Sequence, residues 1–254
     1  AVSAKLPNAK MPEFIGVYNR IEQGAKIYFR TPRLKALLAL NLAIASASAV
    51  VIVNTVVLVQ TTFGLTEKAT TWAFGLFGLG SMLAAFALPK ILDKLNDRAV
   101  MLSGTVVLVV GLLSGYFIST YAWLLALWFI LGIGYSVSQT PTGRLIRKSA
   151  SSENRAALFA AQFAFSHACW LITYPLVGWL STYFGTLITF VPMAFIALVS
   201  MVVAFVTWPR KDDLVLEHTH PDLPQDHEHL LQHNHKGKHE HEFMIDRYHQ
   251  HWPK

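Results

Sequence analysis

Cysteine is almost absent from this chain, since Cys169 is the only one among 254 residues. A single thiol cannot build a disulfide framework, and soft sites such as those for Cu(I) draw on several sulfur ligands. Charge is also scarce, because Asp, Glu, Lys and Arg together make up only 14% of the sequence. No nucleotide-binding loop, catalytic triad or zinc-hydrolase motif occurs in it. Neither an enzyme nor an ATP-driven machine is therefore expected.

The few charges are segregated, which leaves four long stretches without any charged residue: 36–66, 69–89, 99–143 and 156–209. A helix needs about 20 apolar residues to cross a bilayer, so the first two stretches hold one span each and the last two hold two each. The predicted fold is an all-α integral membrane bundle. Its six spans are expected at 34–60, 69–91, 99–118, 122–142, 156–180 and 186–208.

Polar segments flank the predicted bundle, which occupies residues 34–209. Residues 1–33 mix apolar and basic positions, and the part from Met11 to Arg30 predicts an amphipathic helix on the inner membrane surface, or the end of a cytoplasmic linker. Residues 210–254 are polar and predicted to form a disordered cytoplasmic tail.

Basic residues lie almost entirely on one side of the predicted bundle. They precede the first span, follow the second, fourth and sixth, and leave only Lys68 on the other side. The positive-inside rule then places both termini in the cytoplasm of a multi-pass protein in a bacterial-type inner membrane. The net charge of +6 indicates contact with anionic headgroups of the lipid bilayer and not with nucleic acid.

Ten of the eleven histidines lie in the tail. They form five His-x-His pairs: His218 and His220, His227 and His229, His233 and His235, His239 and His241, and His249 and His251. Two imidazoles one residue apart in an extended segment point the same way, and imidazole is a good ligand for zinc, copper and nickel. The tail is predicted to bind a labile divalent metal, with no other cofactor. The alternatives are a solvated tail that binds nothing or an artificial tag, although a tag would be one contiguous run.

Polar residues recur inside the first predicted span. Asn41, Ser48 and Thr55 are spaced by seven residues, so they share one stripe of the helix. That stripe is expected to face inward. Such residues either knit helices together or line a transport pathway, and the sequence favours neither.

The fifth predicted span carries the only titratable group expected at depth in the membrane, His167. It is accompanied on adjoining faces by Gln162, Ser166, Trp170 and Tyr174. A titratable residue inside a bilayer is costly, which makes His167 a candidate proton relay. The alternative is a histidine that is hydrogen-bonded to a neighbouring helix. Gln139, Tyr135 and Thr140 at the inner end of the fourth span are further pathway candidates.

Glycines cluster in three of the spans. Gly104, Gly111 and Gly115 lie along one side of the third span, which indicates close helix packing. The clusters Gly75, Gly78, Gly80 and Gly132, Gly134 are also predicted to be packing positions, with bending points as the alternative.

Two loops resemble signatures of the major facilitator superfamily. The segment from Pro89 to Arg98 is similar to that family's Gly-x-x-x-Asp-Arg/Lys-x-Gly-Arg-Arg loop, with Asp93, Lys94 and Arg98 matching and Pro89, Asn96 and Asp97 departing. Glu153 and Arg155 resemble the Glu-x-Arg-Gly-x-Ala turn that leads into the family's eleventh helix. These five matching residues are the candidate gating set. With six spans and a fifth helix expected to be broken at Pro175 and Gly178, residues 30–209 resemble the C-terminal half of such a transporter.

The resemblance implies that an N-terminal six-helix half is missing as a partner, and that spans one, four and five line the substrate cavity. The histidine-rich tail is further similar to that of nickel-resistance exporters within the superfamily. The implied function is secondary active efflux, coupled to protons, of a divalent cation such as nickel or cobalt. Efflux of an organic compound, with the tail as a metal buffer, stays open, as does a non-transporting metal sensor or scavenger.

Overall fold

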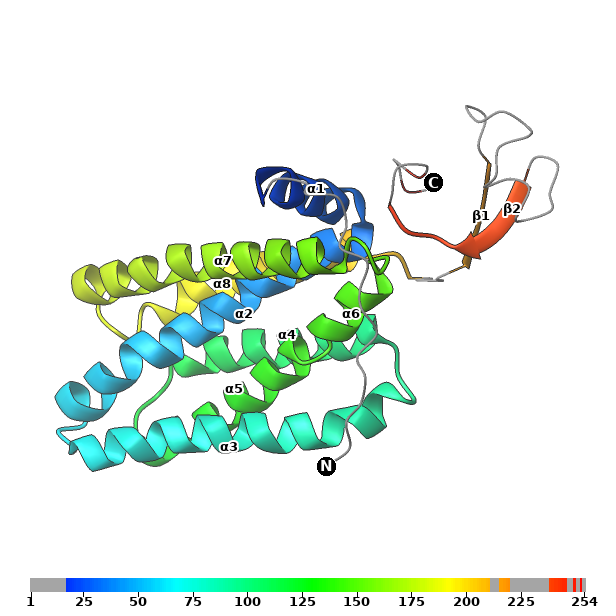
Figure 1. Cartoon of the computed structure of the whole chain (residues 1–254). Helices are drawn as coiled ribbons and strands as arrows, with labels where there is room; N and C mark the ends of the chain where they lie inside the picture. Colours follow the sequence, from blue (N-terminus) through cyan, green and yellow to red (C-terminus); the bar gives the residue numbers. More distant parts are fainter. Residues whose placement is uncertain (1–16, 211–214, 220–237, 246–248, 250–251, 253–254) are drawn as a thin grey trace, which may run out of the picture.

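The computed structural model of this chain describes residues 17–210, 215–219, 238–245, 249 and 252. The elements in chain order are α1 (Val17–Arg30), α2 (Pro32–Val56), the π-helix η1 (Val57–Thr62), α3 (Glu67–Leu92), α4 (Asp97–Gly115), α5 (Tyr121–Gln139), α6 (Thr142–Lys148), α7 (Arg155–Phe184), α8 (Phe190–Thr207), β1 (Val215–Thr219) and β2 (Lys238–Glu242). The long helices run side by side, and α1, α6 and the two strands lie at one end, the tail-side end (Figure 1).

Six helices are long and apolar enough to cross a membrane, which confirms the predicted all-helical membrane bundle. They are Pro32–Thr62, Glu67–Leu92, Asp97–Gly115, Tyr121–Lys148, Arg155–Phe184 and Phe190–Thr207. Their outward faces carry large apolar side chains such as Phe86, Leu171 and Val206, each about three quarters exposed. A lipid environment accounts for an apolar surface of this extent, which water would disfavour.

Local chemistry explains where several helices begin and end. Pro32 occupies the first turn of α2, where its missing N–H costs nothing. The Asn96 side chain accepts from the N–H of Ala99 at 2.7 Å and caps α4, and Gly185 ends α7 with a φ of 91° that favours glycine. In contrast to the expected break, α7 continues through Pro175. Proline removes one backbone N–H donor, and membrane helices tolerate it because neighbouring groups and local adjustments of the helix satisfy the carbonyl that is freed.

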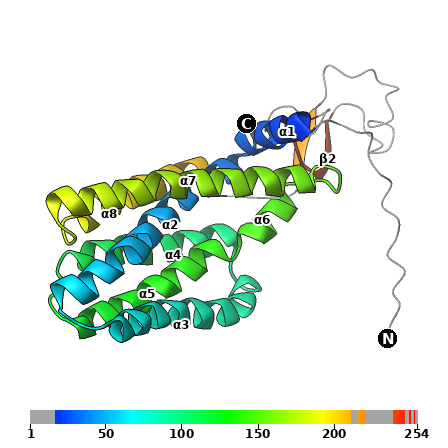
Figure 2. The ribbon, with the colours of Figure 1, turned by 60° about the vertical axis from the view of Figure 1, so that its left-hand side comes forward.

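Glycines bring the transmembrane helices into close contact. The helix pairs α3/α5, α4/α5, α2/α8, α2/α7 and α4/α8 pack directly, which is visible from two directions (Figures 1 and 2). A Cβ at Gly80 would collide with the carbonyl oxygen of Phe129, and one at Gly132 with that of Phe77. The packing role predicted for these two glycines is confirmed. Gly75 and Gly78 have open space where a Cβ would be, so within the described part of the chain they are not packing positions.

Buried apolar residues form two clusters. One surrounds Trp128 and Phe190 in the part of the bundle away from the tail. The other, the tail-side cluster, joins α1, α2, α7 and the tail, and consists of Ile27, Tyr28, Leu34, Ala36, Leu37, Leu40, Met101, Leu145, Ile146, Ala150, Leu158, Ala161, Ala204, Trp208, Phe243 and Ile245. The tail therefore contributes to the core of the described structure.

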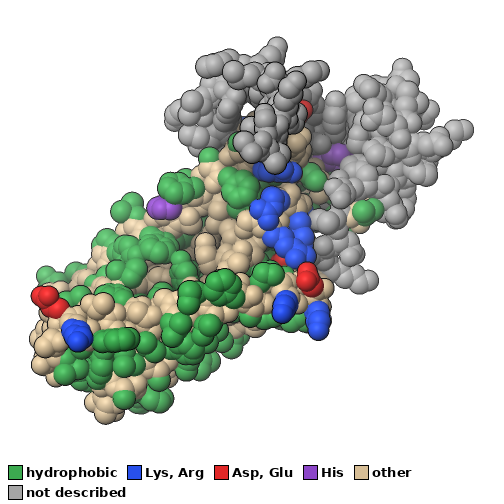
Figure 3. Space-filling model, turned by 60° about the horizontal axis from the view of Figure 1, so that its bottom comes forward, with side chains coloured by type: hydrophobic (Ala, Val, Ile, Leu, Met, Phe, Trp, Pro, Cys, Tyr) green, Lys and Arg blue, Asp and Glu red, His purple; other side chains and the backbone are tan. Residues whose placement is uncertain are grey.

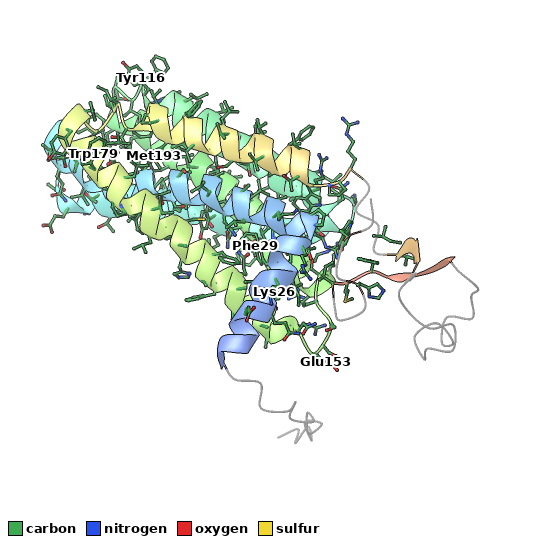
Figure 4. The ribbon with its side chains drawn as sticks, turned by 90° about the horizontal axis from the view of Figure 1, so that it is seen from above. Lys26, Phe29, Tyr116, Glu153, Trp179 and Met193 are labelled. Carbon is green, nitrogen blue, oxygen red and sulfur yellow. The ribbon has the colours of Figure 1, made fainter. Side chains whose placement is uncertain are left out.

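Helix α1 packs on α7 and α2 at the tail-side end (Figure 4). Gly24 allows this approach, because a Cβ there would lie 2.5 Å from the carbonyl oxygen of Ala157. The hydroxyl of Tyr28 donates to Oε1 of Gln162 at 2.5 Å, and burial raises the pKa of Tyr28, so the hydroxyl keeps its proton. Residues 11–16 of the expected amphipathic segment lie outside the described residues.

The tail begins with an antiparallel hairpin of β1 and β2 that projects beyond the bundle (Figure 1). Figure 4 shows Lys26 and Glu153 at the same end as the hairpin, and Tyr116 and Trp179 at the opposite end. After β2, the chain returns to the bundle with Phe243 and Ile245 buried in the tail-side cluster. Much of the segment predicted to be disordered lies outside the described residues.

Candidate functional site

A cavity of about 250 Å³ opens between α2, α5 and α7. Its lining residues are Asn41 and Ile44 from α2, Tyr135 and Gln139 from α5, and Ser166, His167 and Trp170 from α7. These helices are spans one, four and five, the three that the resemblance implies for a substrate cavity. The structure thus brings together five of the predicted pathway candidates: Asn41, Tyr135, Gln139, Ser166 and His167. That they conduct a substrate stays a prediction.

Asn41 is the most unusual residue of the cavity wall. Its side chain is 2% exposed, yet neither its amide nitrogen nor its amide oxygen has a hydrogen-bond partner among the described residues. Leaving a buried polar group unpaired costs about 1–3 kcal/mol, so proteins rarely retain one without a use. A carboxamide that lines a cavity with both atoms unpaired is well suited to bind a ligand that enters it.

His167 contributes the one imidazole of the wall. Its Nδ1 lies 2.8 Å from the carbonyl oxygen of Phe163, and its ring lies against the Phe163 ring with centroids 3.9 Å apart. A carbonyl oxygen only accepts hydrogen bonds, so Nδ1 carries the proton and Nε2 keeps the lone pair when the ring is neutral. Nε2 is then the atom that could accept a proton or bind a metal ion.

The other predicted pathway residues have different surroundings. Thr55 accepts a hydrogen bond from Nε1 of Trp128 at 2.8 Å and donates to the carbonyl of Val51, which is a packing role. The side-chain oxygen of Gln162 accepts a hydrogen bond from the hydroxyl of Tyr28 on α1. Ser48 is buried without a hydrogen-bond partner among the described residues, and Tyr174 lies edge-on to Trp170 with centroids 5.3 Å apart. None of the four lines the described cavity.

Ile44 is a cavity residue that sequence reasoning missed. It follows Asn41 by three positions, so a helical projection of the polar stripe could have identified it. Its apolar side chain gave no chemical signal of its own.

The candidate gating residues divide into two groups. Asp93, Lys94, Glu153 and Arg155 are exposed. Arg98 donates to the carbonyl oxygens of Phe205 at 3.0 Å and Trp208 at 3.2 Å, so it binds the end of α8.

Asp97, which departs from the family signature, makes the ion pairs instead. Its buried carboxylate pairs with Lys148 and lies 3.3 Å from Nε of Arg144, both on α6. The contact between this loop and the end of the fourth span therefore depends on Asp97. The family signature had instead indicated Asp93 as the functional carboxylate of the loop.

A second polar network joins the tail to the same helix. Arg33 is buried, and its Nε donates to Oγ of Ser149 at 2.7 Å while Nη2 donates to the carbonyl oxygen of Lys148 at 2.8 Å. Its guanidinium also lies 5.2 Å from the centroid of the Trp252 ring. A cation over an aromatic face is attractive, so the tail is held at the end of α2 and α6.

The metal-ligand predictions fall mostly beyond the described structure. His220, His227, His229, His233, His235 and His251 lie outside the described residues, and of His218, His239 and His241 only the backbone is described. His249 is 5% exposed and lies edge-on to Phe243, with centroids 4.8 Å apart. Within the described part of the chain, no group of three His, Cys, Asp or Glu side chains is placed to hold a metal ion.

Comparison with protein families gives a match to the Major Facilitator Superfamily over residues 36–234. This chain belongs to the major facilitator superfamily. The match covers all six membrane-capable helices, so the protein is a multi-pass membrane transporter, as expected from the loop signatures. No curated protein matches the chain. Transporters of this kind bind their substrate near the middle of the membrane, at the interface between two repeated halves.

Proposed function

We propose that this transporter exports a divalent cation such as nickel or cobalt, with proton coupling, as the nickel-resistance exporters do. The observation that supports transport through this half is the cavity between α2, α5 and α7, with the unpaired carboxamide of Asn41 in its wall. The observation that supports a metal substrate is the set of His-x-His pairs in the tail. We infer that the tail collects metal ions and raises their concentration at the entrance.

The proposed setting is a bacterial-type inner membrane with the tail in the cytoplasm. Lys and Arg side chains gather at the tail-side end of the bundle (Figure 3), which supports this orientation by the positive-inside rule. A second six-helix half is expected to complete the cavity, and the lipid bilayer to cover the apolar faces. Nucleic acid is not a proposed partner.

His167 is the proposed link to protons. Proton-coupled export of a cation against its gradient needs a group that binds the proton and the cation in turn, but not both at once. Nε2 of His167 can do both, because imidazole is a metal ligand in its neutral form and repels a cation in its protonated form.

An organic compound is the second candidate substrate, and the cavity wall itself favours it. The seven lining residues carry carboxamide, hydroxyl, phenol, imidazole, indole and aliphatic groups, and none of them is an acid or a base other than His167 and the phenol of Tyr135. A bare divalent cation in such a wall would be poorly compensated, whereas a neutral hydrogen-bonding molecule with an aromatic part would fit.

The substitution Asn41→Asp tests the two substrates against each other. It keeps an acceptor oxygen, removes the N–H donor and adds a negative charge. A divalent cation should still be exported, whereas an organic substrate that accepts a hydrogen bond from Asn41 should be transported about tenfold less, since one such bond contributes about 1–2 kcal/mol.

The readout is cellular nickel, cobalt and zinc content, measured by elemental mass spectrometry in cells that express the full-length transporter. Wild type, Asn41→Asp and His167→Ala are compared, with Ser119→Ala, in the exposed loop between α4 and α5, as a control for expression. We expect wild type and Ser119→Ala to lower nickel or cobalt content, Asn41→Asp to retain this effect and His167→Ala to lose it. Unchanged content of all three metals in wild-type cells would reject a metal substrate.

A further inference from the structure

The hairpin at the start of the tail brings histidines from two different His-x-His pairs together. In its antiparallel register, His218 is directly opposite His239, and His241 is opposite Leu216. Eighteen residues of sequence separate the two strands, so sequence spacing alone does not indicate this pairing. Three of the ten tail histidines thus lie in the paired strands of the hairpin: His218, His239 and His241.

The register also assigns these three positions to one face. Successive residues of a strand alternate between faces, and directly opposed residues share a face. Positions 216, 218, 239 and 241 therefore lie on one face, and three of these four are histidine. The opposite face holds Val215, Glu217, Thr219, Lys238, Glu240 and Glu242.

The spacing of these positions suits one metal ion. Directly opposed residues of an antiparallel pair have Cβ atoms about 4.5–5.5 Å apart, and residues two apart on a strand are separated by about 7 Å. Imidazole nitrogens bind zinc at about 2 Å, and backbone positions at this spacing are compatible with three ligands to one ion.

Contacts at both ends of the hairpin hold it in place. Trp208, before β1, and Phe243, directly after β2, are both buried in the tail-side cluster, and Leu216 of β1 packs against the same cluster. Leu216 shares its face of the hairpin with positions 218, 239 and 241. A frame that is already folded loses less entropy when it binds an ion.

We propose that His218, His239 and His241 form one binding site for a borderline divalent cation, namely nickel, cobalt, zinc or copper(II). This site binds more tightly than the remaining tail histidines, which act as weak, independent ligands. Three imidazoles leave coordination positions open, so the ion can be passed on to another ligand. The inference rests on the proposed role of the tail in collecting metal ions.

Equilibrium dialysis of the full-length protein in detergent against Ni²⁺ alone tests this site. The triple variant His218→Gln, His239→Gln, His241→Gln is compared with a matched triple, His227→Gln, His229→Gln, His233→Gln. We expect the first triple to weaken the tightest dissociation constant by about a hundredfold, since joining ligands on one frame raises affinity by that order. The matched triple should lower the number of bound ions and leave the tightest constant unchanged.

A double variant on the opposite face of the hairpin tests whether a change in the hairpin fold, and not the loss of histidines, weakens nickel binding. Glu217→Gln with Glu240→Gln keeps both strands and should leave the tightest constant at the wild-type value. Equal weakening by the two histidine triples would overturn the proposal, because it would indicate an array without a special site. Loss of the tightest site in the Glu variant would also overturn it.

The result is independent of transport. A tight site of this composition in a protein that does not change cellular metal content would uphold the site and reject metal export. Metal export without a difference between the two histidine triples would support metal export and reject the hairpin site.

Discussion

Asp97 carries the contact between the loop after α3 and the helix α6. Its carboxylate is buried and paired with Lys148 and Arg144. Removing one partner of a buried pair leaves the other charges without compensation. We therefore expect Asp97→Asn to lower the free energy of unfolding by about 2 kcal/mol, the usual contribution of a hydrogen bond to a charged group.

Thermal unfolding of the detergent-solubilised protein measures this effect. Asp93→Asn is the matched control, because Asp93 lies four residues earlier, is exposed and makes no ion pair among the described residues. Its change should stay within about 0.5 kcal/mol. Equal losses of stability in the two variants would contradict the assignment to Asp97.

The contact between α3 and α5 depends on Gly80 of α3 and Gly132 of α5, each of which lies against the backbone of the other helix. Gly80→Ala and Gly132→Ala should each force the helices apart and cost about 1–3 kcal/mol, as other substitutions that overfill a packed interior do. Gly78→Ala on the same helix is the control, since a Cβ there meets nothing within 4 Å. A melting temperature that falls only for the first two variants is the expected result. If Gly78→Ala also lowered the melting temperature, the loss of stability would come from reduced helix flexibility and not from a steric clash between α3 and α5.

The return of the tail to the bundle depends on Phe243. Its ring is buried and contacts the rings of His249 and Trp252 with centroids 4.8 Å and 5.2 Å away. We expect Phe243→Ser to release the tail and raise the rate of tryptic cleavage there by about tenfold or more, given the cost of removing a buried phenylalanine. Val215→Ser, which replaces a half-exposed residue of β1, should change the rate much less. Equal rates for Phe243→Ser and wild type would show that the tail is not held by this contact.

At the scale of the whole molecule, the proposed orientation is open to direct measurement. Cys169 is buried and is the one cysteine of the chain, so Cys169→Ser provides a background without thiols. Ser152→Cys lies in the exposed turn before α7 at the tail-side end, and Ser119→Cys lies in the exposed loop between α4 and α5 at the other end. In intact cells, a membrane-impermeant thiol reagent should label only Ser119→Cys, and should label both after lysis. Labelling of Ser152→Cys in intact cells would invert the orientation.

The number and order of the membrane helices followed from the sequence alone, because crossing a bilayer is a local requirement. Each span needs a run of apolar residues without charge, and such runs are visible without knowledge of the fold. The packing role of Gly80 and Gly132 was also predictable, since small residues are where membrane helices approach each other. The three helices around the cavity were expected only through the resemblance to a known family.

The tertiary structure settled which polar groups meet. Asp93 and Asp97 are both carboxylates near the start of α4, and the choice between them depends on Lys148 and Arg144, which are distant in sequence. Gln162 matched the pathway pattern, yet α1 packs across it and supplies Tyr28 as its partner. The pairing of His218 with His239 depends on strand register. Such contacts join residues that are far apart along the chain, and composition and periodicity report only on neighbours within a helix or strand.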